Sequence, residues 1–262
     1  LRLAYGGADV GAALCQHDGI DEVHITGSDR THDIIVWGPP GPERERRKAE
    51  NRPLLEKRIT SELGNVSPLV IVPGEWSERD LNFHAENVAS MLTNNGSFNC
   101  NAAKLLVTHA DWPQRDAFLA TLAGILRKVP ARKAYYPGAH ERYDQFLGAH
   151  SHAQVLGRRT DSVVPWTLID GLDATREDEI AFTTEAFCGV LAEVPLEAAG
   201  AADFLHKATQ FCNDRVWGTL NACVIVHPKT ARDPEVAAAV HAAERDLRYG
   251  TVAINRWPAL AF

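Results

Sequence analysis

A chain of 262 residues with 45% hydrophobic and 23% charged residues has enough apolar content for one large or two modest globular domains. Its 27 basic and 34 acidic residues leave a formal net charge of −7, which argues against a surface that binds nucleic acid. No apolar run is long enough to cross a bilayer, and the five cysteines lack the spacing of a disulfide framework or a zinc site. We therefore expect a cytoplasmic protein with no nucleic-acid, membrane or metal partner.

The first part of the chain alternates between helical and strand patterns. Strands are predicted over 21–26 and 58–63, and helices over 9–16 and 31–37. Between the first strand and the second helix, Gly27-Ser28 forms a turn at a helix N-terminus, where free N–H groups and the helix dipole favour an anion such as a phosphate. A plain turn with Ser28 as N-cap explains the same residues. The composition of 38–57, rich in Pro, Gly and charge, predicts a surface loop.

The rest of the chain continues the alternation. Strands are predicted over 69–72, 105–108, 163–169, 191–194, 221–226 and 251–255, and helices over 78–92, 114–128, 201–213 and 234–247. The segment 135–152 is predicted to be a short helix with a polar loop. Strands that alternate with helices throughout predict an α/β fold, with a mostly parallel sheet flanked by helices.

Cys100 stands in a Gly/Asn-rich loop between the helix 78–92 and the strand 105–108. A cysteine in such a loop can face a cleft, and its thiolate is a nucleophile when a base or a lowered pKa supports it. Glu62, at the end of the strand 58–63, is the candidate base. The alternatives are that Cys100 is a small buried apolar residue and that Glu62 is a surface carboxylate at a strand end.

Four motifs stand in one order: Thr26-Gly27-Ser28, Glu62-Leu63-Gly64, Phe98-Asn99-Cys100 and Glu185-Ala186-Phe187, with a closing Gly250-Thr251-Val252-Ala253-Ile254-Asn255. The set resembles the aldehyde dehydrogenase superfamily, NAD(P)-dependent enzymes that oxidise aldehydes through a cysteine thioester. The resemblance covers nearly the whole chain but only the later part of such an enzyme. Because the chain also begins at Leu1 without an initiator Met, we expect a fragment that is inactive alone.

The resemblance implies a role for each motif. Cys100 would be the nucleophile that adds to the aldehyde, and Glu62 the general base that activates water to hydrolyse the thioester. The resemblance places the remaining motif residues at the NAD or NADP cofactor. Ser28 would contact the pyrophosphate, Glu185 the nicotinamide ribose and Phe187 the ring beside it, with Gly27 and Leu63 also at the cofactor.

The resemblance also implies the organisation of the chain. Residues 1–63 would be a remnant of the dinucleotide-binding domain and 64–262 the catalytic domain. The substrate would be a small-molecule aldehyde, and the intact enzyme a homo-oligomer.

The motifs depart from the family pattern at several places, among them the segment Gly96-Ser97-Phe98-Asn99, which is one residue longer than usual. Gly64-Asn65-Val66 stands where Gly-Gly-Lys is usual, and Cys188-Gly189 replaces Gly-Pro, which would put a second thiol near the cofactor. A CoA-acylating relative, in which a thiol takes the acyl group, is the alternative chemistry, and Glu62 argues against it. A non-catalytic domain that retains the fold is the other alternative.

Overall fold

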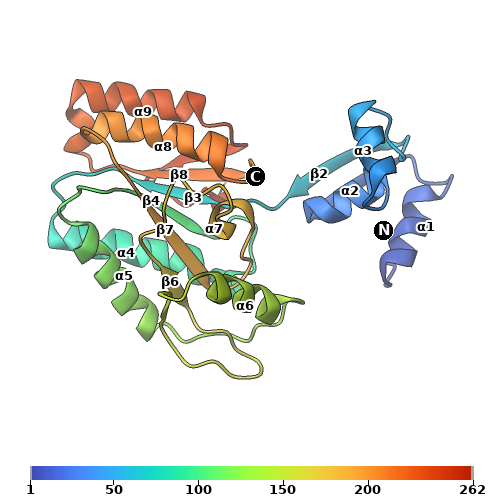
Figure 1. The fold of residues 1–262 in the computed structure, drawn as a ribbon, viewed down its shortest axis with the longest axis horizontal. Helices are drawn as coiled ribbons and strands as arrows, with labels where there is room; N and C mark the ends of the chain where they lie inside the picture. The colour runs from blue at the N-terminus through green and yellow to red at the C-terminus, as the bar shows by residue number, and fades with distance from the viewer. Residues whose placement is uncertain (1, 261–262) are drawn as a thin grey trace. The chain divides into compact units, whose positions relative to one another are not determined.

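The chain folds into two units. The computed structural model describes residues 2–260, and its contacts separate Leu1–Gly64 from Asn65–Phe262. Figure 1 shows the helices and strands of each unit. No helix in the described part of the chain combines the length and apolar character needed to span a membrane.

The first unit is built on a two-stranded parallel sheet. Its strands are β1 (Glu22–Gly27) and β2 (Arg58–Leu63), and its helices are α1 (Ala8–Gln16), α2 (Asp29–Trp37) and α3 (Pro42–Ala49). In the register of the sheet, Thr26 is opposite Glu62 and Gly27 is opposite Leu63. Because the strands are parallel, their carboxyl ends lie at one edge, so the motifs 26–28 and 62–64 lie beside each other.

Helix α3 corrects the prediction that 38–57 is an irregular loop. Pro42 occupies the first turn of the helix, where its missing N–H costs nothing and its fixed φ suits the helix. Glu43 then pairs with Arg46 at 2.8 Å and with Arg47 at 3.0 Å, three and four residues along. Composition predicted a loop, but this charge spacing stabilises a helical turn.

The second unit contains a seven-stranded sheet in the order β5-β6-β7-β4-β3-β8-β9. Its strands are β3 (Pro68–Ile71), β4 (Leu105–His109), β5 (Gln154–Val155), β6 (Thr167–Ile169), β7 (Val190–Leu196), β8 (Asn221–Ile225) and β9 (Thr251–Ile254). Every neighbouring pair is parallel except β5 with β6. The α/β fold with a mostly parallel sheet is thus confirmed. The predicted strand 163–169 is too long, because Pro165 cannot donate to a ladder and β6 begins after it.

Helices cover both faces of this sheet. They are α4 (Glu78–Thr93), α5 (Arg115–Lys128), α6 (Ala139–Ala149), α7 (Ile180–Thr183), α8 (Ala201–Arg215) and α9 (Pro234–Asp246). Helices α8 and α9 pack together on one face and α4 and α5 on the other (Figure 1). α4 begins at a capping box, in which the Ser77 hydroxyl accepts from the Asp80 N–H and the Asp80 carboxylate accepts from the Ser77 N–H.

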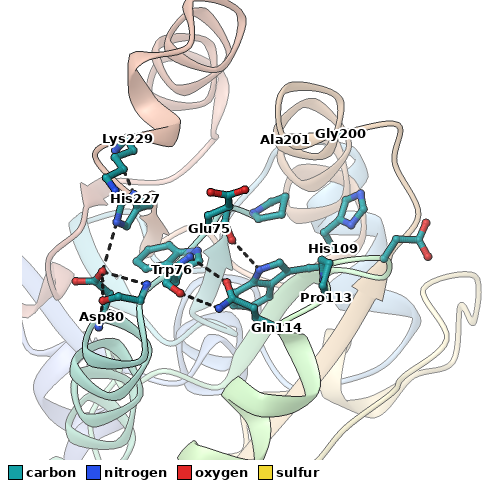
Figure 2. A pocket seen from close by; sticks show the side chains of 15 residues that line it. Glu75, Trp76, Asp80, His109, Pro113, Gln114, Gly200, Ala201, His227 and Lys229 are labelled. Atoms are coloured by element: carbon teal, nitrogen blue, oxygen red, sulfur yellow. Dashed lines mark hydrogen bonds and ion pairs between the residues drawn. The ribbon is translucent and has the colours of Figure 1, made fainter.

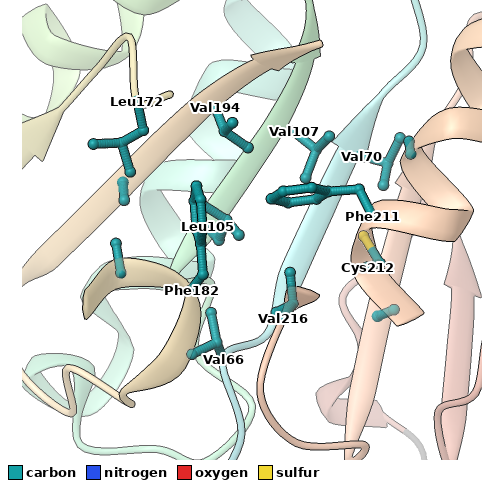
Figure 3. Packing of buried hydrophobic residues seen from close by; sticks show 14 of the residues in the cluster. Val66, Val70, Leu105, Val107, Leu172, Phe182, Val194, Phe211, Cys212 and Val216 are labelled. Carbon is teal, nitrogen blue, oxygen red and sulfur yellow. The ribbon is translucent and has the colours of Figure 1, made fainter. Parts of the chain in front are cut away.

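The two faces of the sheet have separate cores. On one face Val70 and Val107 pack with Phe211 of α8, as Figure 3 shows. On the other face Leu69 and Leu106, their neighbours in β3 and β4, pack with α4 and α5. This alternation is the two-residue period of a strand. Each fully buried side chain of this size contributes about 1.5–3 kcal/mol, so both faces hold the strands in register.

Candidate active site

Cys100 lies in the loop that leads from α4 to the amino end of β4. The loop begins with a single 3-10 turn, Asn94–Ser97, and Cys100 is half-buried. The other described cysteines of this unit, Cys188, Cys212 and Cys223, are buried, and burial raises the pKa of each thiol to about 12. Among the described cysteines of the second unit, solvent therefore reaches Cys100 alone.

The backbone before Cys100 is held in a left-handed conformation. Asn95, Gly96 and Ser97 have φ of 50°, 69° and 69°, a region that disfavours residues with a Cβ. Side-chain amides fix this turn, since Asn95 Nδ2 donates to Phe98 O at 3.2 Å and Asn99 Nδ2 donates to Asn94 Oδ1 at 2.9 Å. The local structure stores strain directly before the cysteine.

The carbonyl oxygen of Cys100 is held by two donors. The Ser67 hydroxyl donates to it at 3.0 Å and the Lys104 ammonium at 2.9 Å. Ser67 is itself buried and also bonds Asn65 Oδ1 at 2.9 Å, while Asn65 Nδ2 donates to Asn221 O at 3.1 Å. A buried polar network thus connects the cysteine to β8, and such a network specifies one backbone conformation.

Lys104 joins two motifs that lie far apart in the sequence. Its side chain is 2% exposed, and Nζ lies 3.1 Å from Glu185 Oε1. Burial lowers the pKa of Lys104 and raises the pKa of Glu185, and each partner opposes the shift of the other. The rings of Phe98 and Phe187 lie 6.1 Å apart between centroids. The motifs 98–100 and 185–187 therefore meet in the folded second unit.

Arg142 of α6 holds the turn that carries Glu185 and Phe187. Its guanidinium donates to Ala186 O at 3.0 Å and to Phe187 O at 3.2 Å. Phe187 has a φ of 43°, so the bonds from Arg142 support a strained position. Tyr136 packs edge-on against Phe187 at 4.8 Å between centroids, which adds to an aromatic wall beside Cys100 and Glu185.

Cys188 follows Phe187 directly, and its thiol is fully buried in the core. Burial raises the pKa of this thiol to about 12, which disfavours the thiolate. That this second thiol lies near a bound cofactor stays a prediction.

The predicted residues of the first unit form a cluster of their own. The register of β1 and β2 places Gly27 opposite Leu63, and Glu62 precedes Leu63 in β2. The Ser28 hydroxyl accepts from the Thr31 N–H at 3.2 Å, so Ser28 is the N-cap of α2. Gly27, Ser28, Glu62 and Leu63 thus lie together in the first unit, whereas Cys100, Glu185 and Phe187 lie together in the second. That Glu62 reaches Cys100 stays a prediction.

A cavity of about 890 Å³ lies at the other end of the sheet, beyond the carboxyl ends of β3, β4 and β8 (Figure 2). Its polar groups hold the surrounding loops together, since Gln114 bonds the Trp76 backbone and Trp112 Nε1 donates to Gly74 O at 3.2 Å. None of the predicted site residues lines this cavity. Within residues 2–260, no three His, Cys, Asp or Glu side chains are arranged to hold a metal ion.

Two residues of the site were not identified from the sequence. Lys104 stands between Ala102-Ala103 and the apolar run of β4. A lysine next to a fully apolar strand is a sequence signal that could have indicated a buried ammonium group. Arg142 lies in a helix with ordinary amphipathic spacing, and no sequence signal distinguishes it. Both side chains donate hydrogen bonds to backbone carbonyls, and a sequence motif does not indicate such bonds because every residue has a carbonyl.

Known proteins similar to this chain are aldehyde dehydrogenases. N-succinylglutamate 5-semialdehyde dehydrogenase of Chromobacterium violaceum is 31% identical over 236 residues, which cover 83% of this chain and 43% of that protein. NADP-dependent glyceraldehyde-3-phosphate dehydrogenase of Bacillus halodurans, solved with NADP, has a TM-score of 0.72 at 18% identity, over 97% of this chain and 48% of that one. Salicylaldehyde dehydrogenase of Pseudomonas putida, solved with salicylaldehyde, has a TM-score of 0.70 at 20% identity. The match covers 95% of this chain and 47% of that one.

These similarities concern less than half of each relative's length. No family model matches the chain. The solved structures establish the fold, and the curated relative adds similarity of sequence along most of the chain. The chain therefore has the aldehyde dehydrogenase fold, and over 83% of its length its sequence is similar to that of an aldehyde dehydrogenase.

Proposed function

We propose that this chain carries the nucleophile and part of the cofactor site of an NAD(P)-dependent aldehyde dehydrogenase that converts an aldehyde to a carboxylic acid through a cysteine thioester. One observation carries the proposal. Lys104 Nζ donates to the Cys100 carbonyl at 2.9 Å and forms an ion pair with Glu185 Oε1 at 3.1 Å, so the nucleophile motif and the ribose-binding motif meet. A half-buried thiol in the same site as a half-buried carboxylate and aromatic rings suits a reaction shielded from water.

Cys100 performs the covalent chemistry in this proposal. Its thiolate adds to the aldehyde carbon, and the carbonyl π electrons move to the oxygen, which becomes an oxyanion. After the two-electron oxidation the same sulfur carries the acyl group as a thioester. Water then attacks the thioester carbon, the carboxylic acid forms and the thiolate leaves. Glu62 takes the proton from this water in the proposal, which requires it to reach the thioester through one water molecule.

The residues of the second unit fit the nicotinamide end of a dinucleotide. NAD(P)+ supplies the oxidising power when it is bound. The Glu185 side chain is 18% exposed, so its carboxylate can accept hydrogen bonds from ribose hydroxyls while Lys104 neutralises its charge. Phe187 and Tyr136 provide an apolar wall for a planar ring. The neutralised carboxylate and the adjacent aromatic wall are the features that support this assignment.

The residues of the first unit would serve the other parts of the reaction. Gly27 and Ser28 lie at the N-terminus of α2, where the helix dipole favours a pyrophosphate, and Leu63 lies beside them at the end of β2. We further propose that 1–63 is part of the dinucleotide-binding domain and 64–262 the catalytic domain, and that the intact enzyme is a cytoplasmic homo-oligomer. Five cysteines, an odd number without the spacing of a disulfide framework, support a reducing compartment.

The proposal can be tested without any cofactor. An activated ester such as p-nitrophenyl acetate acylates a reactive thiolate directly, so incubation should place one acetyl group on Cys100, located by peptide mass spectrometry. Cys100→Ala should remove this modification and the accompanying burst of nitrophenolate. Cys15, half-buried in the first unit, is the internal control for an ordinary thiol. If Cys100 is acetylated no faster than Cys15, the assignment of Cys100 as nucleophile is wrong.

Glu62→Gln tests the base separately. The acetyl group should still form on Cys100 at the parent rate, because the base acts on the water of the second step. Its hydrolysis should slow by about a hundred- to ten-thousand-fold, the usual contribution of a positioned general base. Normal hydrolysis in Glu62→Gln would assign the base to another residue and leave the role of Cys100 intact.

A further inference from the structure

The Lys104 ammonium has more acceptors around it than it has hydrogens. Nζ donates to Asn99 O at 3.2 Å, to Cys100 O at 2.9 Å and to Ala102 O at 3.1 Å, and it lies 3.1 Å from Glu185 Oε1. An ammonium has three N–H donors and a neutral amine only two. Three carbonyls and a carboxylate around one buried nitrogen therefore favour the charged form, against the effect of burial.

We propose that Lys104 is a positioning residue for Cys100, a buried cation that holds the cysteine loop in its reactive conformation and favours the thiolate. This inference rests on the proposed function, in which Cys100 is the nucleophile. It adds a residue that belongs to none of the sequence motifs, and it predicts a reactivity that depends on a side chain four positions away.

The geometry explains how one side chain performs both tasks. Its three carbonyl partners all lie in the loop of Cys100, so the ammonium closes the loop around itself. The side chain is 2% exposed, and little water lies near to screen its charge. A negative charge on Cys100 opposes the lowering of the Lys104 pKa, as expected for opposite charges held in the same loop. A nearby cation is a common way for a protein to activate a cysteine.

Three other titratable or charged groups face this pair. Glu185 shares the ammonium and opposes the thiolate by its own negative charge. Arg142 acts on Glu185 from α6, and the buried Cys188 thiol stays neutral because its pKa is about 12. Glu185 is therefore the group that must be held constant in a test. Since the loop carbonyls provide the other three acceptors, Lys104 retains partners when the charge of Glu185 is removed.

The matched comparison is Glu185→Gln against the double variant Lys104→Met/Glu185→Gln. The double variant leaves no buried charge without a partner, so it avoids the largest cause of misfolding. A third variant, Lys104→Gln/Glu185→Gln, keeps amide donors for the loop but has no charge, and it also serves if the methionine variant fails to fold. In each protein the alkylation rate of every cysteine by iodoacetamide is measured across pH by peptide mass spectrometry.

Relative to Glu185→Gln, both double variants should alkylate Cys100 about tenfold more slowly at neutral pH, with the midpoint of the pH profile about one unit higher. Cys15, in the first unit, should react at the same rate in every variant. If the double variants keep the rate and the pH profile of Glu185→Gln, Lys104 has only a structural role and the inference is wrong. If Cys100 of the unsubstituted chain reacts no faster than Cys15, the proposed function itself fails, and the assigned role of Lys104 fails with it.

Discussion

Ser97 provides a test of the strain stored beside Cys100. It has a φ of 69°, its side chain is buried, and its hydroxyl has no hydrogen-bond partner among the described residues. Glycine adopts this backbone conformation without a Cβ penalty, and it removes the hydroxyl as well. We expect Ser97→Gly to stabilise the second unit, although Ser97 lies three residues from the proposed nucleophile.

The magnitude follows from four contributions. The left-handed conformation costs a residue with a Cβ about 1–2 kcal/mol, and a buried hydroxyl without a partner costs about 1–3 kcal/mol. Against this relief, glycine adds about 0.5–1 kcal/mol of unfolded-chain entropy, and the void left by the side chain costs roughly 0.5–1 kcal/mol. The expected net gain in the free energy of unfolding is about 2 kcal/mol, or an increase in Tm of about 4–8 °C for a unit of this size.

Thermal and urea unfolding followed by tryptophan fluorescence would measure the gain, because all tryptophans except Trp37 lie in the second unit. Ser97→Ala is the matched control, since it removes the hydroxyl but keeps the Cβ and should gain less than Ser97→Gly. Gly96→Ala should destabilise, because Gly96 has the same φ and an added Cβ would lie 3.1 Å from the Phe98 ring. If Ser97→Gly melts at or below the temperature of the unsubstituted chain, the left-handed turn is not a cost and the reasoning is wrong.

Three further substitutions test other parts of the second unit. Arg142→Met removes the hydrogen bonds to the carbonyls of 186 and 187, so the free energy of unfolding should fall by about 1.5–3 kcal/mol. Amide hydrogen exchange at 186–188, measured by mass spectrometry, should become faster, and an unchanged exchange rate would contradict the role of Arg142 in supporting that turn. Arg115→Met should lower the free energy of unfolding by about 3–5 kcal/mol in urea, because Glu193 is fully buried and would lose its charged partner, whereas Arg115→Met/Glu193→Gln should recover most of the loss. Burial lowers the pKa of His84 below its usual 6.5, so the unfolded chain binds the proton first and stability should fall as pH drops through 6.5. His84→Gln should weaken this acid dependence of the urea midpoint, and equal pH dependence in both proteins would contradict it.

The local pattern of residues determined the elements and their class. Apolar runs such as Leu105-Leu106-Val107 and the periodic spacing of 78–92 are properties of neighbouring residues, so they indicate strands and helices before any tertiary contact forms. Regular alternation of the two then implies a parallel sheet. The prediction failed at 42–49, where charge pairs three and four residues apart stabilise a helix in a sequence whose composition is that of a loop.

Only the tertiary structure decided which distant residues meet. Cys100 and Glu185 were both predicted from motifs, but their connection through Lys104 depends on β4 and β7 being neighbours in the sheet. Sheet order is set by long-range packing, and it leaves no signal within a short stretch of sequence. The same applies to Arg142, whose bonds to the backbone carbonyls of 186–187 do not depend on the identity of those residues. Motifs therefore predicted the candidate site residues, whereas the side chains that contact the backbone around these residues were found only in the folded chain.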